Sequence, residues 1–381
     1  MKQNMTMVNK TVWSLSCVCF SLSTLLSLVG IISVIEIYYN VSIYYASLYA
    51  SIFAGILGFS SLVLPAVFSR FEKKKMIIII LCITIICNLI EMFVSNYYVG
   101  VIFRIIPAFT YPIAVSAALT IVGEIKPNDT NKVVLGISSG SILGLSITTY
   151  LGLNHGFQMT MIWFVLINAL SLLLVVLFIP EFEGNKEPVM IQISHAKSKL
   201  FVLSTLFVLL MIIGISITYN YIPLYLSQVT DINGDMLFVT LFLMGLISMF
   251  GTILYGYFLQ KNTKISIIFY PIGFIIVMFA LGTFVRFPFF EFLILMIFSI
   301  FDGSIDTVAQ YAIISSLPEA PEFANGIYLL LINFSIFLGT MIGGAIIDII
   351  SILFIFIGSM ISMLLALPFV LARVKFYPDK Q

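Results

Sequence analysis

Two aspartates lie one helical turn apart in a stretch that otherwise has the composition of a membrane span. The stretch is IFSIFDGSIDTVAQY, residues 297–311, and the aspartates are Asp302 and Asp306. Ser299 and Gln310 extend the spacing to three, four and four residues, which puts all four side chains on one helical face. A charge at mid-bilayer costs about 2.5–3.5 kcal/mol, and like charges at this spacing repel each other. The pair therefore indicates proton binding or binding of a cation; the alternative is a structural role, in capping a broken helix or bonding to a neighbouring span.

Arg104 is the only basic residue well inside an apolar run, and it needs a counter-ion or carbonyl partners there. A rise of 1.5 Å per residue puts it roughly 8–10 Å below the outer end of its helix. Glu91 lies at a similar depth on the preceding antiparallel run, whereas Asp302 lies roughly 10 Å deeper. We therefore expect Glu91 to be the partner of Arg104, and the alternative to a functional role is a packing salt bridge.

These side chains belong to a chain that is 61% apolar and 9% charged, with a mean hydropathy of +1.15. Soluble domains carry about 25% charged residues, so this composition indicates an integral membrane protein in a lipid bilayer. No Walker lysine or HExxH pattern occurs, which argues against an ATP-driven pump and against a zinc enzyme. No basic domain supports nucleic-acid binding. The cysteines lie in apolar runs and the two histidines are far apart, so we expect neither a metal site nor a cofactor.

The elements that position these residues are predicted to be twelve membrane helices, because each needs about 20 mostly apolar residues. Charged or turn-forming clusters separate them. The predicted spans are 11–36, 44–68, 76–95, 98–121, 134–153, 160–179, 200–222, 236–259, 265–284, 290–313, 326–347 and 351–372.

Lysine and arginine set the predicted orientation. With the N-terminus inside, all of the 18 basic residues except Arg104 and Arg286 fall on the cytoplasmic side. This bias predicts cytoplasmic termini in a cell membrane. High isoleucine and lysine usage suggests a bacterial source.

A polar segment divides the chain into two halves. Residues 181–199 form a predicted cytoplasmic linker between an N-terminal bundle, residues 1–180, and a C-terminal bundle, residues 200–381. A short basic turn follows the second span of each half, as VFSRFEKKKMIII and YFLQKNTKISII. We therefore predict an all-α membrane protein with two pseudo-symmetric six-helix bundles.

Three stretches resemble the major facilitator superfamily. SRFEKKK resembles its basic turn after span two, with Ser69 in place of the usual acid and Glu72 in place of glycine. RIIPAFTYPIAVSAAL resembles its motif with a membrane-embedded arginine, here Arg104. LPEAPEFANGIYLLLINFSIFLGTMIGGAIID, residues 317–348, resembles spans ten to eleven of the sugar-efflux and multidrug-efflux branch of proton antiporters, which includes arabinose-efflux-like permeases.

The resemblance implies a secondary transporter in which spans one, four, seven and ten line a central cavity. It implies proton-coupled efflux of a small amphipathic or cationic molecule by a monomer. The alternatives are export of a neutral sugar or metabolite, and a membrane sensor or assembly protein that does not transport. The proton-coupling residues would be Asp302, Asp306, Arg104 and Glu91. The substrate-binding residues would be Asp302, Gln310, Tyr219, Asn220, Tyr111 and Ser116. The gating residues would be Arg70, Lys73, Lys74, Gly140 and Gly144.

Two departures from the branch bear on these expectations. The fifth span, GISSGSILGLSITTYLG, keeps small residues at spacing four, which permits close helix approach, but lacks the usual proline. The first span has Glu36 near its outer end as its only acid. Two ordinary roles also remain open: the turn at residues 70–75 as a positive-inside anchor, and the tyrosines as an interface belt.

Overall fold

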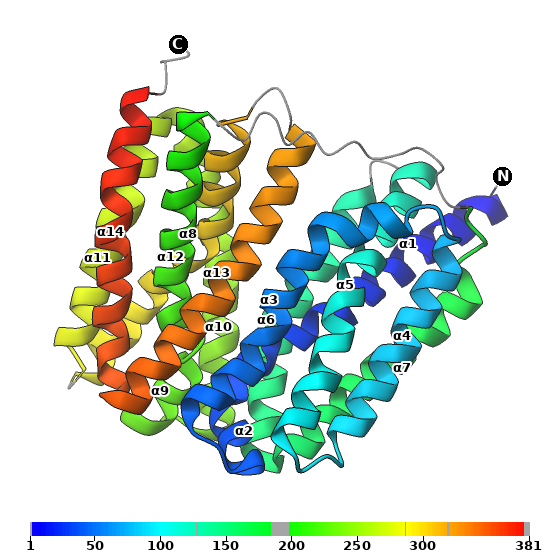
Figure 1. Cartoon of the computed structure of the whole chain (residues 1–381), viewed down its shortest axis with the longest axis horizontal. Coiled ribbons are helices and arrows are strands. Elements are labelled where there is room, and N and C mark those ends of the chain that lie inside the picture. The colour runs from blue at the N-terminus through cyan, green and yellow to red at the C-terminus, as the bar shows by residue number, and fades with distance from the viewer. Residues whose placement is uncertain (1, 127–128, 184–197, 286, 318–320, 377–381) are drawn as a thin grey trace. The chain divides into compact units, whose positions relative to one another are not determined.

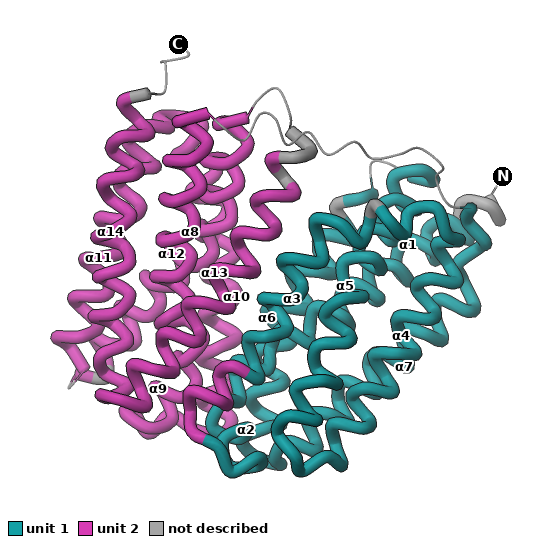
Figure 2. Tube along the Cα trace, viewed as in Figure 1, with its two compact units in different colours: residues 1–41, 49–189 teal, residues 42–48, 190–381 magenta. Residues whose placement is uncertain are grey.

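The structure, a computed structural model, describes residues 2–126, 129–183, 198–285, 287–317 and 321–376 (Figure 1). Every regular element in these ranges is helical. The chain divides into two compact units (Figure 2). Residues 1–41 and 49–189 make unit 1, and residues 42–48 and 190–381 make unit 2.

The first unit begins with a span built from three helical segments. These are α1 (Lys2–Ser23), the 3₁₀ helix η1 (Thr24–Ile31) and α2 (Ile32–Tyr39). Single helices follow, and the start of the first of them belongs to unit 2. They are α3 (Ile43–Phe68), α4 (Lys73–Glu91), α5 (Tyr97–Ile125), α6 (Thr130–His155) and α7 (Phe157–Phe178).

The second unit also begins with a span that is not one continuous helix. α8 (Lys199–Tyr219) ends shortly before α9 (Ile222–Val229), which carries Pro223 in its first turn. The remaining elements are α10 (Gly234–Lys261), α11 (Thr263–Thr283), α12 (Pro288–Ile314), α13 (Pro321–Ile349), η4 (Ile352–Phe354) and α14 (Ile355–Phe376).

The helices of each unit pack in the same order. In unit 1, α1 packs on α6 and α7, while α4 packs on α5 and α7. In unit 2, α8 packs on α13 and α14, while α11 packs on α12 and α14. In each unit, therefore, the first span contacts the fifth and sixth, and the third contacts the fourth and sixth. The predicted pair of pseudo-symmetric helical bundles is confirmed.

Local sequence explains where several of these helices begin. Asn96 accepts hydrogen bonds from the backbone N–H groups of Tyr98 and Val99 and so caps α5. Ser198 and Asn262 cap α8 and α11 in the same way. In the described ranges, eleven helical spans are long and apolar enough to cross a membrane. The twelfth predicted span is α4, which is 19 residues long and begins with three lysines.

Glycines allow α6 to lie close along the first span. A Cβ at Gly140 would lie 2.4 Å from the backbone oxygen of Phe20, and one at Gly144 would lie 3.0 Å from Cα of Thr24. The close helix approach predicted from the spacing of the small residues is therefore confirmed. In unit 2, Gly339 of α13 lies in the same way against α8, where an added Cβ would meet the carbonyl oxygen of Ile213 at 2.8 Å.

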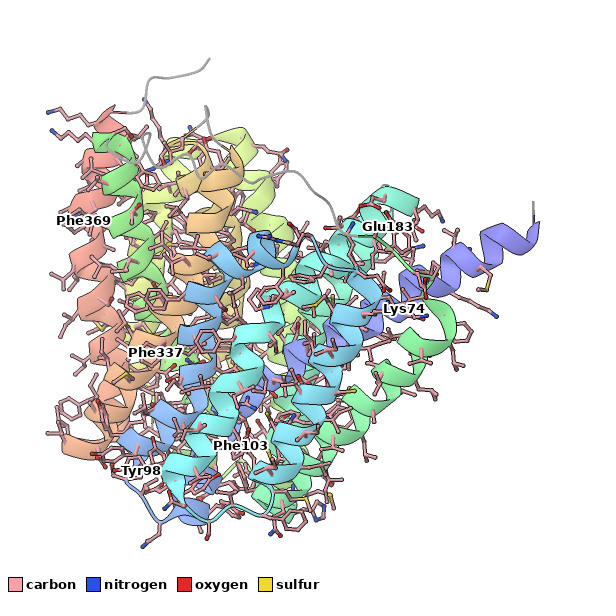
Figure 3. All side chains as sticks on the ribbon, turned by 45° about the vertical axis from the view of Figure 1, so that its right-hand side comes forward. Lys74, Tyr98, Phe103, Glu183, Phe337 and Phe369 are labelled. Atoms are coloured by element: carbon pink, nitrogen blue, oxygen red, sulfur yellow. The ribbon has the colours of Figure 1, made fainter. Side chains whose placement is uncertain are left out.

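The predicted linker, residues 181–199, lies mostly outside the described residues. Its described beginning is tied to α4, because the backbone N–H of Lys73 donates to the carbonyl of Phe182 at 3.0 Å. Lys74 and Glu183 accordingly lie at one end of unit 1, and Tyr98, at the start of α5, lies at the opposite end (Figure 3).

Candidate functional site

Asp302 lies near the middle of α12, at a point where α12 touches α10 closely. A carboxylate oxygen, Oδ2, accepts a hydrogen bond from Oγ of Ser248 on α10 at 3.1 Å. The next residue, Gly303, permits the contact, since a Cβ there would lie 1.7 Å from the backbone oxygen of Ser248. Thr252 adds a hydrogen bond to the Gly303 carbonyl at 2.6 Å. Asp302 therefore occupies a fixed, half-buried position.

Asp306 is bonded to a different helix. Its side chain is hydrogen-bonded to Tyr328 of α13, and the carboxylate itself is exposed. Exposure rises along the predicted stripe: Ser299 is buried, Asp302 is half-buried, and Asp306 and Gln310 are exposed. In the described residues, no ion pair within 4.0 Å involves either aspartate. The stripe thus runs from a buried position on α12 to an exposed one, and both acids have hydroxyl partners.

Arg104 is fully buried in unit 1, and its hydrogen-bond partner is a backbone carbonyl. Nη2 donates to the carbonyl oxygen of Leu25 in η1. The guanidinium carbon lies 4.8 Å from the ring centroid of Phe53 and 5.8 Å from that of Phe164. Two of its nitrogens, Nε and Nη1, have no hydrogen-bond partner. Because a guanidinium has five N–H donors, this one is only partly satisfied.

Glu91 shares this cluster but does not form an ion pair with Arg104. It is fully buried, and Oε2 accepts a hydrogen bond from the Tyr49 hydroxyl at 2.6 Å, while Oε1 has no partner. The carboxylate is close enough to act electrostatically on Arg104, yet no ion pair within 4.0 Å joins them in the described parts of the chain. Equal depth predicted that Glu91 is the partner of Arg104, and this pairing is wrong for the described structure. The two residues lie in one cluster, but the arginine bonds the Leu25 carbonyl, because helix rotation, which depth does not indicate, decides the partner.

The predicted substrate-binding residues separate into the two units. In unit 2, Tyr219 ends α8 within electrostatic range of Asp302, and Asn220 is buried with Nδ2 2.5 Å from Oγ1 of Thr340. In unit 1, the Tyr111 hydroxyl is 2.9 Å from Oγ of Ser23, below the Arg104 cluster. The polar side-chain atoms of Asn220 and Tyr111 are thus hydrogen-bonded to other residues within the helical core.

Ser116 lines a small pocket in unit 1 together with one of the predicted gating residues. The pocket has a volume of about 120 Å³. It lies between the end of α3, the start of α4 and the second half of α5. Its lining combines the hydroxyl groups of Ser116 and Thr120 and the charged Lys73 with the apolar side chains of Phe68, Phe71 and Met76.

The predicted gating residues of the basic turn differ in environment. Lys73 is buried and bonded to Glu124 of α5 at 2.5 Å. Lys74 donates to the carbonyl of Val176 on α7 at 3.4 Å, and Arg70 is exposed. Lys73 therefore ties α4 to α5.

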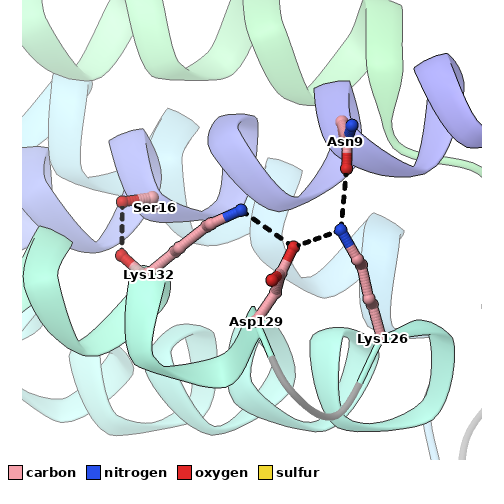
Figure 4. A network of polar contacts seen from close by, with 5 residues as sticks. All are labelled: Asn9, Ser16, Lys126, Asp129 and Lys132. Atoms are coloured by element: carbon pink, nitrogen blue, oxygen red, sulfur yellow. Dashed lines mark hydrogen bonds and ion pairs between the residues drawn. The ribbon is translucent and has the colours of Figure 1, made fainter.

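A second polar network joins the loop between α5 and α6 to α1 (Figure 4). Lys126 bonds Oδ1 of Asn9 at 3.0 Å and Oδ2 of Asp129 at 2.7 Å. Lys132 bonds the same carboxylate oxygen at 2.9 Å, and its carbonyl accepts from Ser16. These hydrogen bonds, that of Lys126 first, lower the pKa of Asp129. The sequence placed both lysines on the cytoplasmic side without indicating these partners.

Two buried groups in unit 2 were missed by the sequence analysis. Glu291, in the first turn of α12, is buried and accepts a hydrogen bond from the hydroxyl of Tyr225 on α9. Arg373 of α14 is also buried, and it bonds Ser204 at 2.8 Å, Ser315 at 2.7 Å and the carbonyl of Ala312 at 3.2 Å. The sequence counted Arg373 only as one more cytoplasmic charge.

Among the described residues, no group of three or more histidine, cysteine or acidic side chains is placed to hold a metal ion. The chemistry that the described sites can perform is binding and release of protons and hydrogen bonding to a ligand, and both units contain buried or half-buried acids for it.

Solved structures of transporters share this fold. The nucleoside transporter NupG matches with a TM-score of 0.74 and 15% identity, over 97% of this chain and 100% of NupG. A bacterial homologue of the human lysosomal transporter Spinster, in an inward-facing and unoccupied conformation, matches with a TM-score of 0.71 and 13% identity, over 97% of each chain.

Sequence relatives are also transporters. A protein of Helicobacter pylori (strain P12) named "Probable sugar efflux transporter" is 24% identical over 322 residues, which is 82% of each chain. One of the same name from Mannheimia succiniciproducens is 22% identical over 86% of this chain and 84% of its own. The family model described as Major Facilitator Superfamily matches residues 12–287. The chain is therefore a multi-pass membrane transporter that belongs to the Major Facilitator Superfamily.

Proposed function

We propose that this transporter exports a small amphipathic or cationic molecule in exchange for protons, by alternating access. Asp302 and Asp306 exchange protons against the cargo. The observation that carries this proposal is the partner set of the two acids, in a helix long and apolar enough to cross the membrane. Ser248 bonds one and Tyr328 bonds the other. No lysine or arginine lies within 4.0 Å of either in the described residues.

Hydroxyl partners suit a carboxyl group that changes its protonation state. A hydroxyl can donate to a carboxylate and can accept from a carboxylic acid, whereas a lysine or arginine can only donate. The bonds from Ser248 and Tyr328 therefore survive the loss and the return of a proton. A permanent cation beside Asp302 would favour one state and oppose exchange.

The cost of charge in the membrane supplies the driving force for proton uptake. An ionised aspartate at mid-bilayer costs about 2.5–3.5 kcal/mol, and two like charges at i and i+4 repel each other. A proton or a cationic cargo relieves both costs, so the two compete for the same acids. The graded exposure from Ser299 to Gln310 supports access of both to Asp306 first and to Asp302 behind it.

A neutral sugar is the second candidate for the cargo. The names of the relatives from Helicobacter and Mannheimia support it. In that case the acids handle only protons, and hydroxyl and amide groups such as Gln310 bind the cargo. We also propose that the protein works as a monomer in the cell membrane with both termini in the cytoplasm, which the distribution of lysine and arginine supports.

Transport in reconstituted vesicles tests the proposal. We expect uphill transport of tetraphenylphosphonium or of lactose under an imposed pH gradient, and its collapse when the gradient is dissipated. Asp302→Asn should abolish uphill transport while leaving exchange of the neutral cargo, lactose, between equal concentrations. Asp235→Asn is the matched control, because Asp235 is an exposed acid at the start of α10.

Two results would change the account. Gradient-driven uphill transport by Asp302→Asn would show that another group carries the proton. Loss of tetraphenylphosphonium transport with unchanged uphill lactose transport would make Asp302 a residue that binds cargo and does not carry the proton.

A further inference from the structure

The first span changes its helix type in its middle. Between α1 and α2, residues Thr24–Ile31 form a 3₁₀ helix of eight residues. Runs of this kind longer than three or four residues are uncommon, and a 3₁₀ stretch inside a longer helix often marks a hinge. A 3₁₀ helix rises about 2.0 Å per residue and an α-helix 1.5 Å, so conversion of η1 would shorten the span by about 4 Å.

Side-chain hydrogen bonds, one from α5 and two from within η1, accompany this form. Arg104 donates to the Leu25 carbonyl. Ser27 bonds Oγ1 of Thr148 on α6 at 2.7 Å and the carbonyl of Thr24 at 2.5 Å. Arg104 is the only charged one of these donors, and hydrogen bonds from charged groups are about twice as strong as neutral ones.

The same guanidinium has a second acceptor within its cluster. Two of its nitrogens and Oε1 of Glu91 all lack partners, although all are buried. Buried polar atoms are nearly always hydrogen-bonded, so three unpaired atoms in one cluster indicate a second arrangement. The rings of Phe53 and Phe164 lie near the guanidinium, with centroids 4.8 and 5.8 Å from its carbon.

We propose that Arg104 is a two-position latch on the first span. When Glu91 is protonated, Arg104 binds the Leu25 carbonyl and η1 stays 3₁₀. When Glu91 is ionised, Arg104 turns to Oε1, the carbonyl is released, and η1 becomes α-helical. This inference rests on the proposed proton coupling, and it assigns Arg104 and Glu91 a mechanical role in it.

The surroundings of Glu91 leave Arg104 as the group that responds. The titratable and charged groups around it are Tyr49 from α3, Tyr39 from α2, Arg104 from α5 and Cys87 from α4 itself. The sequence of α7, which also packs on α4, contains no titratable residue. Tyr49 can bond to either form of the carboxyl group, whereas a guanidinium gains an ion pair only with the ionised form.

The packing of α6 would transmit the change. A Cβ at Gly144 would lie 3.0 Å from Cα of Thr24, and one at Gly140 would lie 2.4 Å from the backbone oxygen of Phe20. With contacts this close, side chains cannot absorb a shift of several ångströms along the span. α6 must move with it, which gives Gly140 and Gly144 their predicted part in gating.

Spin labels at the two ends of the first span test the latch in the full chain. Trp13 and Ile37 are exposed, at 55% and 79%, and flank η1. Each is replaced by cysteine and labelled, in a background without the native cysteines, and the distance is measured by double electron–electron resonance in lipid nanodiscs. We expect the distance to shorten by about 4 Å between about pH 6 and about pH 9.

Variants separate the latch from the transport proposal. Glu91→Gln should hold the long distance at both pH values, and Arg104→Gln the short one. Asp302→Asn should keep the full pH response, even though it abolishes uphill transport. An unchanged distance in the otherwise unaltered chain overturns the latch even if neither variant folds, and so does a pH response that persists in Glu91→Gln. Suppose that Asp302→Asn abolishes uphill transport but the distance across the first span does not change with pH in the otherwise unaltered chain. That result would overturn the latch and leave the proton-exchange proposal standing.

Discussion

A methyl group at Gly303 tests whether the close contact of α10 and α12 positions Asp302. In Gly303→Ala the new Cβ would lie 1.7 Å from the backbone oxygen of Ser248. Real Cβ atoms stay at least 3.0 Å from such an atom, so the two helices must separate by about 3.0 − 1.7 = 1.3 Å. Truncating the Ser248 side chain cannot relieve this clash, because the obstacle is its backbone.

The separation has two consequences of calculable size. Overpacking of this kind costs about 1–3 kcal/mol, against about 0.5–1 kcal/mol gained by replacing glycine with alanine in a helix. A net loss of about 1–2 kcal/mol is expected. The bond from Ser248 to Asp302, now 3.1 Å, would stretch toward about 4.4 Å, which is beyond hydrogen-bonding distance.

Thermal unfolding in detergent and uphill transport in vesicles measure the two consequences. Gly256→Ala, in α10, is the matched control, because a Cβ there meets nothing within 4 Å and should stabilise slightly. Ser248→Ala removes the bond to Asp302 without the clash, so it should impair coupling and leave unfolding nearly unchanged. If Gly303→Ala unfolds at the same temperature as Gly256→Ala and transports normally, the packing argument is refuted.

Two further predictions concern contacts away from the acids. Arg373→Lys keeps the charge but loses the forked bonds to Ser204 and its other partners, so we expect a loss of about 3 kcal/mol in unfolding free energy. The exposed Lys375→Ala is the control that should not change stability, and equal melting temperatures of the two variants would contradict the prediction. Asp129 has a lowered pKa, so its ion pairs stabilise the fold above its ordinary value of 3.8 and this contribution is lost as pH falls through the lowered one. Asp129→Asn should therefore lower the melting temperature at neutral pH, and this decrement should shrink as the pH falls below 3.8; a decrement that stays constant with pH would count against the linkage.

The sequence predicted the features that depend on pattern along one helix. Spans follow from apolar length, and the acidic stripe from spacings of three and four. The small residues around Gly140 and Gly144 predicted close helix packing, which the contacts with Phe20 and Thr24 confirm. The roles assigned to these residues in gating stay predictions.

Features that depend on rotation about a helix axis or on backbone type could not be predicted. Depth alone paired Arg104 with Glu91, but whether the guanidinium reaches the carboxylate or the Leu25 carbonyl depends on where each helix faces. The sequence TLLSLVGI has no proline and an apolar pattern that suits an α-helix as well as a 3₁₀ helix. Arg373 could not be told from other terminal charges, because its partners come from α8 and α12.

A comparison of the two first spans supports the assignment of η1 to Arg104. Unit 2 has its own buried tyrosine–glutamate pair, Tyr225 with Glu291, and one oxygen of Glu291 is likewise unpartnered. No ion pair within 4.0 Å reaches that carboxylate in the described residues. In the corresponding first span, which α8 and α9 make up, α8 is α-helical from Lys199 to Tyr219 with no 3₁₀ stretch, and Arg373 bonds α8 through the Ser204 side chain. A buried acid bonded to a tyrosine is thus present in both units, and the unit whose first span holds a 3₁₀ stretch is the one in which an arginine bonds that stretch. This contrast is what the proposed latch predicts, in which the arginine holds the first span out of the α-helical form.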